Sequence, residues 1–232
     1  MPGKWSDAFE IGATTFRVCS DGRTISVLRL NTREYAVLEP RCERCGHPVL
    51  SGSQCSTCAS WHTLERVTAM GTYVPKHRRS SGESHHLSED VLRAKDDRDI
   101  AFMLGTVLGL FVKHEHPSLL EYDTVTCVPS VRPQDHSEII AHAFCNITKH
   151  RGFRTDLLIR TGGTKMVGRG RVERWKIARN EFGLGHGHLA SGASVLLIDD
   201  ILTDGATLDT CATLLRPKGA SRVHGLVVAR AI

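Results

Sequence analysis

Apolar and polar residues alternate along residues 14–38, a pattern typical of strands with one buried face. Asp21-Gly22 interrupts this alternation with a turn signal, so we expect a small β-hairpin here. Residues 64–74 predict a further strand. Residues 76–90 are polar and rich in Ser, Gly and His, which indicates a flexible linker. The part of the chain before this linker is therefore expected to form a small β-rich module.

Strand and helix patterns alternate from residue 97 onward. Helical periodicity covers residues 97–114, 135–150 and 207–216, and strand patterns cover residues 123–128, 154–160, 194–198 and 222–229. The continuous apolar run at 194–198 is typical of a strand covered on both faces. Alternating strands and helices predict an α/β domain with a mainly parallel sheet. We therefore divide the chain into a first module over residues 1–75, a linker over 76–90 and an α/β domain over 91–232.

The composition narrows the class of protein. The chain has 232 residues, 41% of them hydrophobic, which is enough for a sizeable core and argues against general disorder. Its formal net charge of +5 permits a nucleic acid or a phosphorylated ligand as partner without requiring one. No signal peptide is visible at the start, and the longest apolar run, residues 100–112, is shorter than the roughly 20 residues of a membrane span. We expect a cytoplasmic protein with no membrane span.

Four of the eight cysteines form two CxxC pairs, and the other four are scattered singly. The paired cysteines are Cys42, Cys45, Cys55 and Cys58. In a cytoplasmic chain such clustering indicates a metal site rather than disulfides. Four thiolates around one ion suit zinc, and a closed set of four leaves no open position for catalysis, so we predict a structural zinc. An iron–sulfur cluster and redox dithiols are the alternatives.

The stretch from Val195 to Thr207 carries the most information about chemistry. An apolar strand delivers two adjacent carboxylates, Asp199 and Asp200, and a short loop with Gly205 leads into a helix. Ligands bind at the carboxyl edge of a parallel sheet, and a loop before a helix offers N–H groups to an anion. A sugar phosphate would satisfy both halves, with its hydroxyls on the carboxylates and its phosphate in the loop. The alternative is a buried strand that ends in an exposed acidic turn.

This strand, Asp-Asp pair, loop and helix resemble the phosphoribosyl pyrophosphate (PRPP) signature of type I phosphoribosyltransferases. With the cysteine quartet ahead of it, the chain resembles the ComF family. The resemblance covers the quartet, residues 91–95, the strand that ends in Val128-Pro129, and residues 154–229. It implies a parallel-sheet type I phosphoribosyltransferase-like domain with five core strands, preceded by a small β-rich zinc-ribbon module. It also allows a homodimer.

The resemblance assigns roles to residues of this sequence. Asp199 and Asp200 would contact the ribose hydroxyls. The loop that would hold the 5′-phosphate comprises Thr203, Asp204, Gly205, Ala206 and Thr207. The loop that would hold the pyrophosphate comprises Pro129, Ser130, Val131 and Arg132. Magnesium would bridge oxygens of PRPP itself.

Two departures from the family pattern leave catalytic activity open. Asp204 stands where such loops usually carry Thr or Ser, and its carboxylate would repel a phosphate unless it turns outward or pairs with a cation. After Pro129 the usual Arg-Gly-Phe-Asn segment is replaced by residues 132–136, Arg-Pro-Gln-Asp-His. The triplet Arg151-Gly152-Phe153 follows only after the next helix and is not treated as its equivalent.

Residues 160–179 carry seven Lys and Arg residues against Glu173 alone, and four glycines make the segment flexible. In the related fold a mobile loop at this place closes over the active site, where cations would neutralise the departing pyrophosphate. Lys165 and Arg174 are our candidates for catalytic contact with the ligand. The alternatives are a solvated basic loop and a nucleic-acid contact.

Two functions follow from these patterns. The first is a protein that binds PRPP, or another sugar phosphate, with magnesium and transfers or senses a phosphoribosyl group. The second is a non-catalytic factor that binds single-stranded nucleic acid in DNA uptake or processing and keeps the fold as a relic. The sequence does not identify the acceptor of a phosphoribosyl group.

Overall fold

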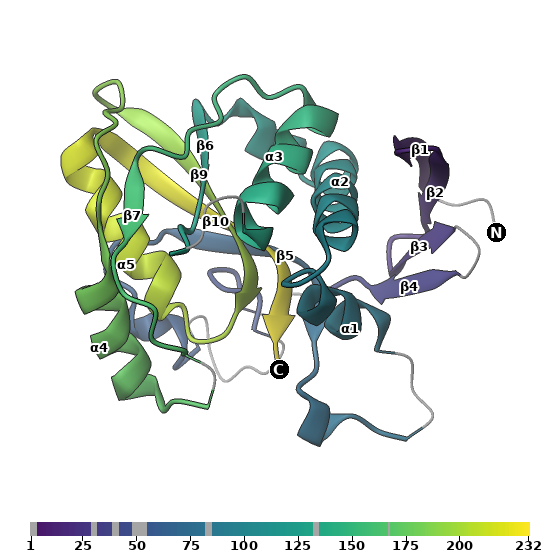
Figure 1. The fold of residues 1–232 in the computed structure, drawn as a ribbon, viewed down its shortest axis with the longest axis horizontal. Coiled ribbons are helices and arrows are strands. Elements are labelled where there is room, and N and C mark those ends of the chain that lie inside the picture. The colour runs from purple at the N-terminus through teal and green to yellow at the C-terminus, as the bar shows by residue number, and fades with distance from the viewer. Residues whose placement is uncertain are drawn as a thin grey trace.

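A parallel sheet lies at the centre of the molecule (Figure 1). The structure is a computed structural model, and it describes residues 4–28, 32–38, 42–47, 55–81, 85–131, 135–166 and 168–232. Within them the sheet has the strand order β5-β10-β9-β6, and all neighbouring pairs are parallel. The strands are β5 (Arg66–Tyr73), β10 (Ala220–Ala231), β9 (Ala193–Leu202) and β6 (Thr124–Cys127). The predicted α/β fold with a parallel sheet is confirmed.

Helices cover both faces of this sheet (Figure 1). One hydrophobic cluster takes residues from α1 (His86–Arg93), α2 (Arg98–Glu115) and α3 (His136–Thr148). A second cluster takes residues from α4 (Arg171–Glu181) and α5 (Ala206–Leu215). Because both faces are covered, β9 is buried at almost every position, which explains the apolar run at 194–198. Short 3₁₀ helices span Cys58–Ser60, Lys76–Arg78, Pro117–Glu121 and Arg216–Lys218.

The helices predicted at residues 97–114 and 135–150 are confirmed as α2 and α3. Each begins directly after an aspartate, Asp97 or Asp135, whose side chain accepts hydrogen bonds from two backbone N–H groups of the first turn. Such caps satisfy donors that have no partner inside the helix. They fix where the two helices begin, and α3 therefore starts close to the end of β6.

The N-terminal segment forms an antiparallel sheet in the order β1-β2-β3-β4. Its strands are β1 (Trp5–Ile11), β2 (Thr14–Ser20), β3 (Thr24–Leu28) and β4 (Arg33–Ala36). The predicted hairpin is confirmed as β2 and β3, and the Asp21 carboxylate closes its turn by accepting hydrogen bonds from the N–H groups of Arg23 and Thr24. The buried face of this sheet belongs to the same hydrophobic cluster as α1 and α2.

The four-stranded count differs from the five strands that the resemblance implies. Of residues 154–160, only β7 (Leu158–Arg160) is a strand, and it pairs antiparallel with β8 (Phe182–Leu184) in a separate small sheet. Beside β6 the chain makes a single parallel bridge, between Val125 and Phe153. Directly afterwards Arg154 pairs with Asp156 at 2.7 Å, and the chain leaves the edge of the sheet.

β5 is the edge strand of the parallel sheet, paired with β10 from the far end of the chain. The sequence analysis assigned residues 64–74 to the first module, yet they belong to the central sheet. The four paired cysteines lie in the hydrophobic cluster of α5, whereas the N-terminal sheet lies in that of α1 and α2. The division of the chain at residues 75 and 91 stays a prediction. No helix in the described ranges has the length and apolar character needed to cross a membrane.

Candidate functional site

Two adjacent aspartates lie near the carboxyl end of β9, at the edge where parallel sheets meet their ligands. Asp199 and Asp200 are each 9% exposed. The Asp199 carboxylate accepts the N–H of Asp200 at 3.0 Å, and the Asp200 carboxylate accepts the N–H of Ile201. Burying two charged carboxylates costs free energy unless each has a partner. The groups around them therefore determine which of the two carries a charge.

Two basic side chains from distant parts of the chain contact Asp200. Lys95, just after α1, places its Nζ 3.3 Å from Oδ2 of Asp200. His136, the first residue of α3, places its Nε2 3.1 Å from the same oxygen. Asp200 is therefore a buried carboxylate between a lysine and a histidine.

The two carboxyls have opposite protonation tendencies. Burial, helped by the charge of Asp200, raises the pKa of Asp199 well above its usual range. Burial also acts to raise the pKa of Asp200, but the hydrogen bond from His136 and the charge of Lys95 outweigh it and lower that pKa. The charge of Asp200 in turn raises the pKa of Lys95. The pair thus holds one firmly ionised carboxylate beside one that tends to keep its proton.

Neither Lys95 nor His136 was predicted to belong to the site. The sequence could have indicated that His136 lies at the site. Asp135 is a good helix N-cap and predicts that a helix begins at His136, shortly after the strand β6. No local pattern distinguishes Lys95 from the other lysines of the chain.

The predicted pyrophosphate loop lies at the same edge of the sheet. Cys127 of β6 pairs with Ile198 of β9, so the chain after β6 emerges beside the two aspartates. Pro129 and Ser130 are half-buried there, and Val131 is exposed. Arg132 lies outside the described residues. Contact of this loop with pyrophosphate stays a prediction.

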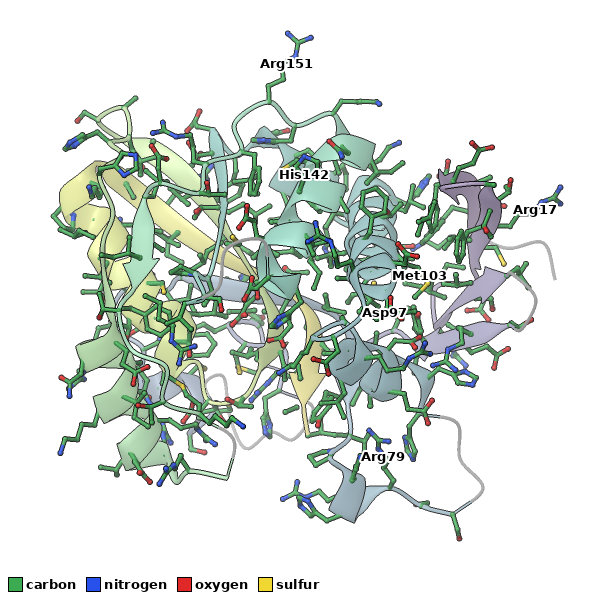
Figure 2. All side chains as sticks on the ribbon, viewed as in Figure 1. Arg17, Arg79, Asp97, Met103, His142 and Arg151 are labelled. Atoms are coloured by element: carbon green, nitrogen blue, oxygen red, sulfur yellow. The ribbon has the colours of Figure 1, made fainter. Side chains whose placement is uncertain are left out.

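The triplet at residues 151–153 does not reach this edge. Arg151 extends away from the fold into solvent, as Figure 2 shows. Phe153 bridges to Val125, two residues before the carboxyl end of β6. The triplet therefore does not take the place of the missing Arg-Gly-Phe-Asn segment at this edge.

The loop from Thr203 to Thr207 leads from β9 directly into α5. Gly205 precedes the helix with a φ of +84°, a left-handed conformation that disfavours every residue with a Cβ. Thr203 is exposed and Thr207 is half-buried. The start of a helix beside a turn of this kind is a general anion site, because its N–H groups and dipole favour negative charge.

Asp204, the residue that departs from the family pattern, is paired with a cation. Its Oδ2 accepts hydrogen bonds from Nε and Nη2 of Arg174 at 3.1 and 3.0 Å. Its other oxygen, Oδ1, accepts the N–H of Ala206 at 3.2 Å. Asp204 is only 6% exposed, so this pairing neutralises a nearly buried negative charge in residues 203–207, the predicted phosphate loop. Of the alternatives considered for Asp204, the structure shows the cation pair.

The basic segment 160–179 is only partly a loop. Its second half is α4, which begins after Gly170, the last of its glycines, where the sequence turns to good helix formers. The expectation of a flexible loop throughout was therefore wrong for residues 171–179. Met166 reaches the phosphate loop, since its sulfur accepts the Thr207 hydroxyl at 3.6 Å. Lys165 is exposed and forms no ion pair within the described part of the chain.

The four paired cysteines converge on one point. Their sulfurs all lie within 4.8 Å of one another, and the four residues are buried. The Sγ–Sγ distances are 3.6 Å for Cys42–Cys58, 3.2 Å for Cys45–Cys55 and 3.7 Å for Cys55–Cys58. Sulfurs bound at ~2.3 Å to a tetrahedral zinc ion lie about 3.8 Å apart. The donor set is therefore placed to hold one metal ion of this kind.

The surroundings lower the pKa of two of these thiols, Cys42 and Cys55, whereas burial raises that of Cys45 and Cys58. Burial acts to raise the pKa of Cys42, but the N–H groups of Cys55, Cys45 and Arg44 outweigh it and lower the pKa to about 6. A metal binds the thiolate rather than the thiol, so backbone donors directed at the sulfur favour binding.

Comparison with solved structures finds distant likenesses. One is with an allosteric regulatory enzyme of purine biosynthesis, with 16% identity over 96% of this chain and 42% of that chain, at a TM-score of 0.37. Another is the glutamine PRPP amidotransferase from B. subtilis complexed with ADP and GMP, with 15% identity over 96% of this chain and 43% of that chain, at a TM-score of 0.37. The chain thus spans less than half the length of either enzyme.

A hypoxanthine phosphoribosyltransferase from Staphylococcus aureus matches over 62% of this chain and 73% of its own, with 15% identity and a TM-score of 0.32. No protein-family model matches the chain. No curated protein matches it in sequence.

Proposed function

We propose that this chain is a PRPP-binding protein of the phosphoribosyltransferase type, and that it belongs to the ComF family. The proposal rests on one arrangement above all: an ionised Asp200 and the phosphate loop lie next to each other at the carboxyl end of β9. A ribose 5-phosphate group presents hydroxyls and a phosphate at the same two places. Another sugar phosphate of the same length would meet the same groups.

Each residue would have a distinct task. Asp200, kept ionised by Lys95 and His136, accepts hydrogen bonds from the ribose hydroxyls. The loop that ends at Gly205 offers its N–H groups to the 5′-phosphate. Because Arg174 neutralises Asp204, the loop does not oppose that phosphate with a free negative charge. Lys165 is exposed beside Met166 and would supply positive charge to the pyrophosphate.

Magnesium fits this site because carboxylate and phosphate oxygens are its preferred ligands. Oxygens of PRPP would provide most of them, with Asp199 and Asp200 nearby. Its chemistry would be to neutralise charge on the pyrophosphate as the bond to ribose breaks.

A calorimetric titration with PRPP and magnesium tests the proposal. We expect micromolar binding to the wild-type chain and none to Asp200→Asn, which keeps the shape of the side chain and removes its charge. Asp123→Asn is a matched control, because Asp123 bonds Ser194 near the other end of β9. Absence of binding to the wild-type chain, or equal binding to all three proteins, would contradict the proposal.

We further propose that the cysteine cluster holds a structural zinc ion. Four buried thiolates at tetrahedral spacing suit zinc, and they leave no position for a substrate. The homodimer stays a prediction.

A groove on the surface favours the second candidate function, binding of single-stranded nucleic acid in DNA uptake or processing. It measures about 470 Å³ and lies between α4 and the residues that follow the cysteine cluster. Its described lining contains Trp175 and three cations, Arg171, Lys176 and Arg179, and no carboxylate. The Arg179 guanidinium lies 5.5 Å from the Trp175 ring centre. Cations beside an aromatic ring can bind backbone phosphates and stack a base.

Oligonucleotide binding at a series of salt concentrations tests this second candidate. Replacing Lys176 and Arg179 by glutamine should weaken binding and flatten its dependence on salt. Equal replacement of Lys113 and Arg17, which are exposed on α2 and β2, is the control. If the wild-type chain does not bind at low salt, the candidate fails while the PRPP proposal is unaffected.

A further inference from the structure

The indole of Trp61 lies against the backbone of the phosphate loop. Trp61 is 4% exposed, and its Nε1 donates a hydrogen bond to the carbonyl oxygen of Asp204 at 2.8 Å. The same ring fills the space beside Gly205, where an added Cβ would stand 2.3 Å from Nε1 and 2.4 Å from Cε2. The loop and the ring are thus fitted to each other, although 143 positions separate Trp61 from Asp204.

The cysteine cluster fixes the position of this indole. Trp61 follows the short helix that begins at Cys58, and its N–H donates to the carbonyl of Cys58 at 3.1 Å. Arg44, between the first two cysteines, donates to the carbonyls of both Cys58 and Trp61, at 3.0 and 3.1 Å. Its guanidinium also lies 5.6 Å from the Trp61 ring centre. Both CxxC segments therefore hold the residue that touches the phosphate loop.

A second connection joins the same segment to α5. Asp209, which is 2% exposed, accepts the N–H groups of His62, Thr63 and Leu64 at 3.1, 2.9 and 2.8 Å. Asp209 lies one turn after the start of α5, whose N-terminus forms part of the phosphate loop. These three hydrogen bonds hold the segment after the cysteine cluster firmly against α5. Without the Asp209 carboxylate, all three backbone N–H groups would lack a partner.

A buried cation contacts the chain that enters the loop. Arg230 is 2% exposed, and its Nη1 donates to the carbonyl of Leu202 at 2.9 Å and also to that of Thr203. Burial lowers the pKa of its guanidinium, although the charges of Cys45, Cys55, Asp204 and Cys42 oppose this effect. Arg230 thus holds the carbonyl groups of the chain that enters the loop.

We propose that Trp61 is a positioning residue that transmits the state of the cysteine cluster to the phosphate loop. The loop holds its ligand-binding shape while the cluster is closed around its metal. When the cluster opens, the indole moves and the carbonyl of Asp204 and the turn at Gly205 lose their support. Affinity for the phosphate of the ligand then falls, although no cysteine touches the ligand. The ligand part of this inference rests on the proposed function.

The test compares Trp61→Phe with Trp5→Phe. Both substitutions keep an aromatic ring and remove an indole hydrogen bond, but Trp5 donates to Glu115 in the N-terminal part of the fold. Hydrogen–deuterium exchange of the backbone amides at residues 203–207 is measured in both, with bound zinc determined on the same samples. We expect exchange to rise about 2- to 10-fold in Trp61→Phe, as for the loss of one hydrogen bond, with zinc content unchanged. Trp5→Phe should leave the loop unchanged.

Removal of the metal distinguishes transmission from ordinary packing. In the wild-type chain a chelator should speed exchange in the loop. In Trp61→Phe the chelator should increase exchange in the loop by a smaller factor. The substitution has already removed the hydrogen bond through which the metal acts on the loop, so the effects of the substitution and of metal removal should not be additive. Fully additive effects, or an unchanged loop in Trp61→Phe, would overturn the inference. Hydrogen–deuterium exchange is measured without a ligand, so it tests the link between the cysteine cluster and the loop even if PRPP does not bind. Failure to bind PRPP would contradict the proposed function but not this link.

Discussion

Arg174 donates two hydrogen bonds to one oxygen of Asp204, at 3.1 and 3.0 Å, and so joins α4 to the phosphate loop. Asp204 is the residue that sets this loop apart from the PRPP signature that it resembles. A carboxylate there would repel a phosphate if it were free, yet here it is bound by a cation and by the N–H of Ala206. The departure and its compensation lie on different elements, and only the fold brings them together.

Loss of the cation should therefore weaken ligand binding. In Arg174→Met the nearly buried carboxylate loses its partner and opposes the incoming phosphate. We expect PRPP affinity to fall at least about tenfold, since a hydrogen bond to a charged group contributes about 1.5–3 kcal/mol. Isothermal titration with PRPP and magnesium measures this change.

A second substitution checks the cause. Asp204→Asn added to Arg174→Met removes the unpaired charge and should recover most of the lost affinity. Arg154→Met is the control, because Arg154 pairs with Asp156 outside the phosphate loop. If the double variant binds as weakly as Arg174→Met, then Arg174 acts directly on the ligand and not through Asp204.

The turn at Gly205 should tolerate no side chain. Gly205→Ala meets two costs: a left-handed φ of +84° and a Cβ placed 2.3 Å from the Trp61 indole. Gly192→Ala meets only the first, because its φ is +82° and nothing lies within 4 Å of its added Cβ. Denaturant unfolding should show a loss of about 1–2 kcal/mol for Gly192→Ala and a larger loss for Gly205→Ala. Equal losses would mean that Trp61 moves aside without cost.

Local patterns predicted the parts of the site that are continuous in sequence. The run from Val195 to Thr207 is a strand, a turn and a helix start in direct succession, so its chemistry could be read from neighbouring residues. The two CxxC pairs could likewise be predicted from neighbouring residues, because the spacing within each pair brings its two thiols together. The hairpin at Asp21-Gly22 also depends only on its own turn.

Contacts between distant segments could not be predicted in this way. His136 and Asp200 are 64 positions apart, and Trp61 and Asp204 are 143 apart. β5 looked like part of the first module because its partner, β10, is the last strand of the chain. Such pairings are set by packing across the whole fold, which no window of sequence contains.

Each of the four cysteines should be required for the metal. Purified wild-type chain should contain about one zinc ion, as a closed tetrahedral site holds one. Cys58→Ser should lose most of it and unfold at lower denaturant, because a buried three-thiolate site is left incomplete. Cys19→Ser is the control, since Cys19 is half-buried in β2 outside the cluster. Metal analysis that finds well under one equivalent in the wild type, with no effect of Cys58→Ser, would refute the metal site.

The contact between His136 and Asp200 should make stability depend on pH. Burial acts to lower the pKa of His136, but the hydrogen bond and charge of Asp200 outweigh it and raise the pKa above the usual 6.5. A base with a raised pKa in the folded state adds stability that is complete below its unfolded pKa and is lost as pH rises through the folded value. Asp200 stays ionised and Lys95 stays charged over this range, because their pKa values are shifted downward and upward respectively.

The free energy of unfolding of the wild type, compared with His136→Gln from about pH 5 to pH 9, isolates this effect. The advantage of the wild type should be greatest at the acid end and should shrink as His136 loses its proton. Asp135, the other acid at the start of α3, is present in both proteins, whereas the charge of His136 also lowers the pKa of Asp199, so Asp199 contributes to the difference between the two curves. A difference that is flat with pH, or that grows toward the alkaline end, would show that His136 does not bind Asp200 as a cation. In that case Lys95 and the N–H of Ile201 would keep Asp200 ionised.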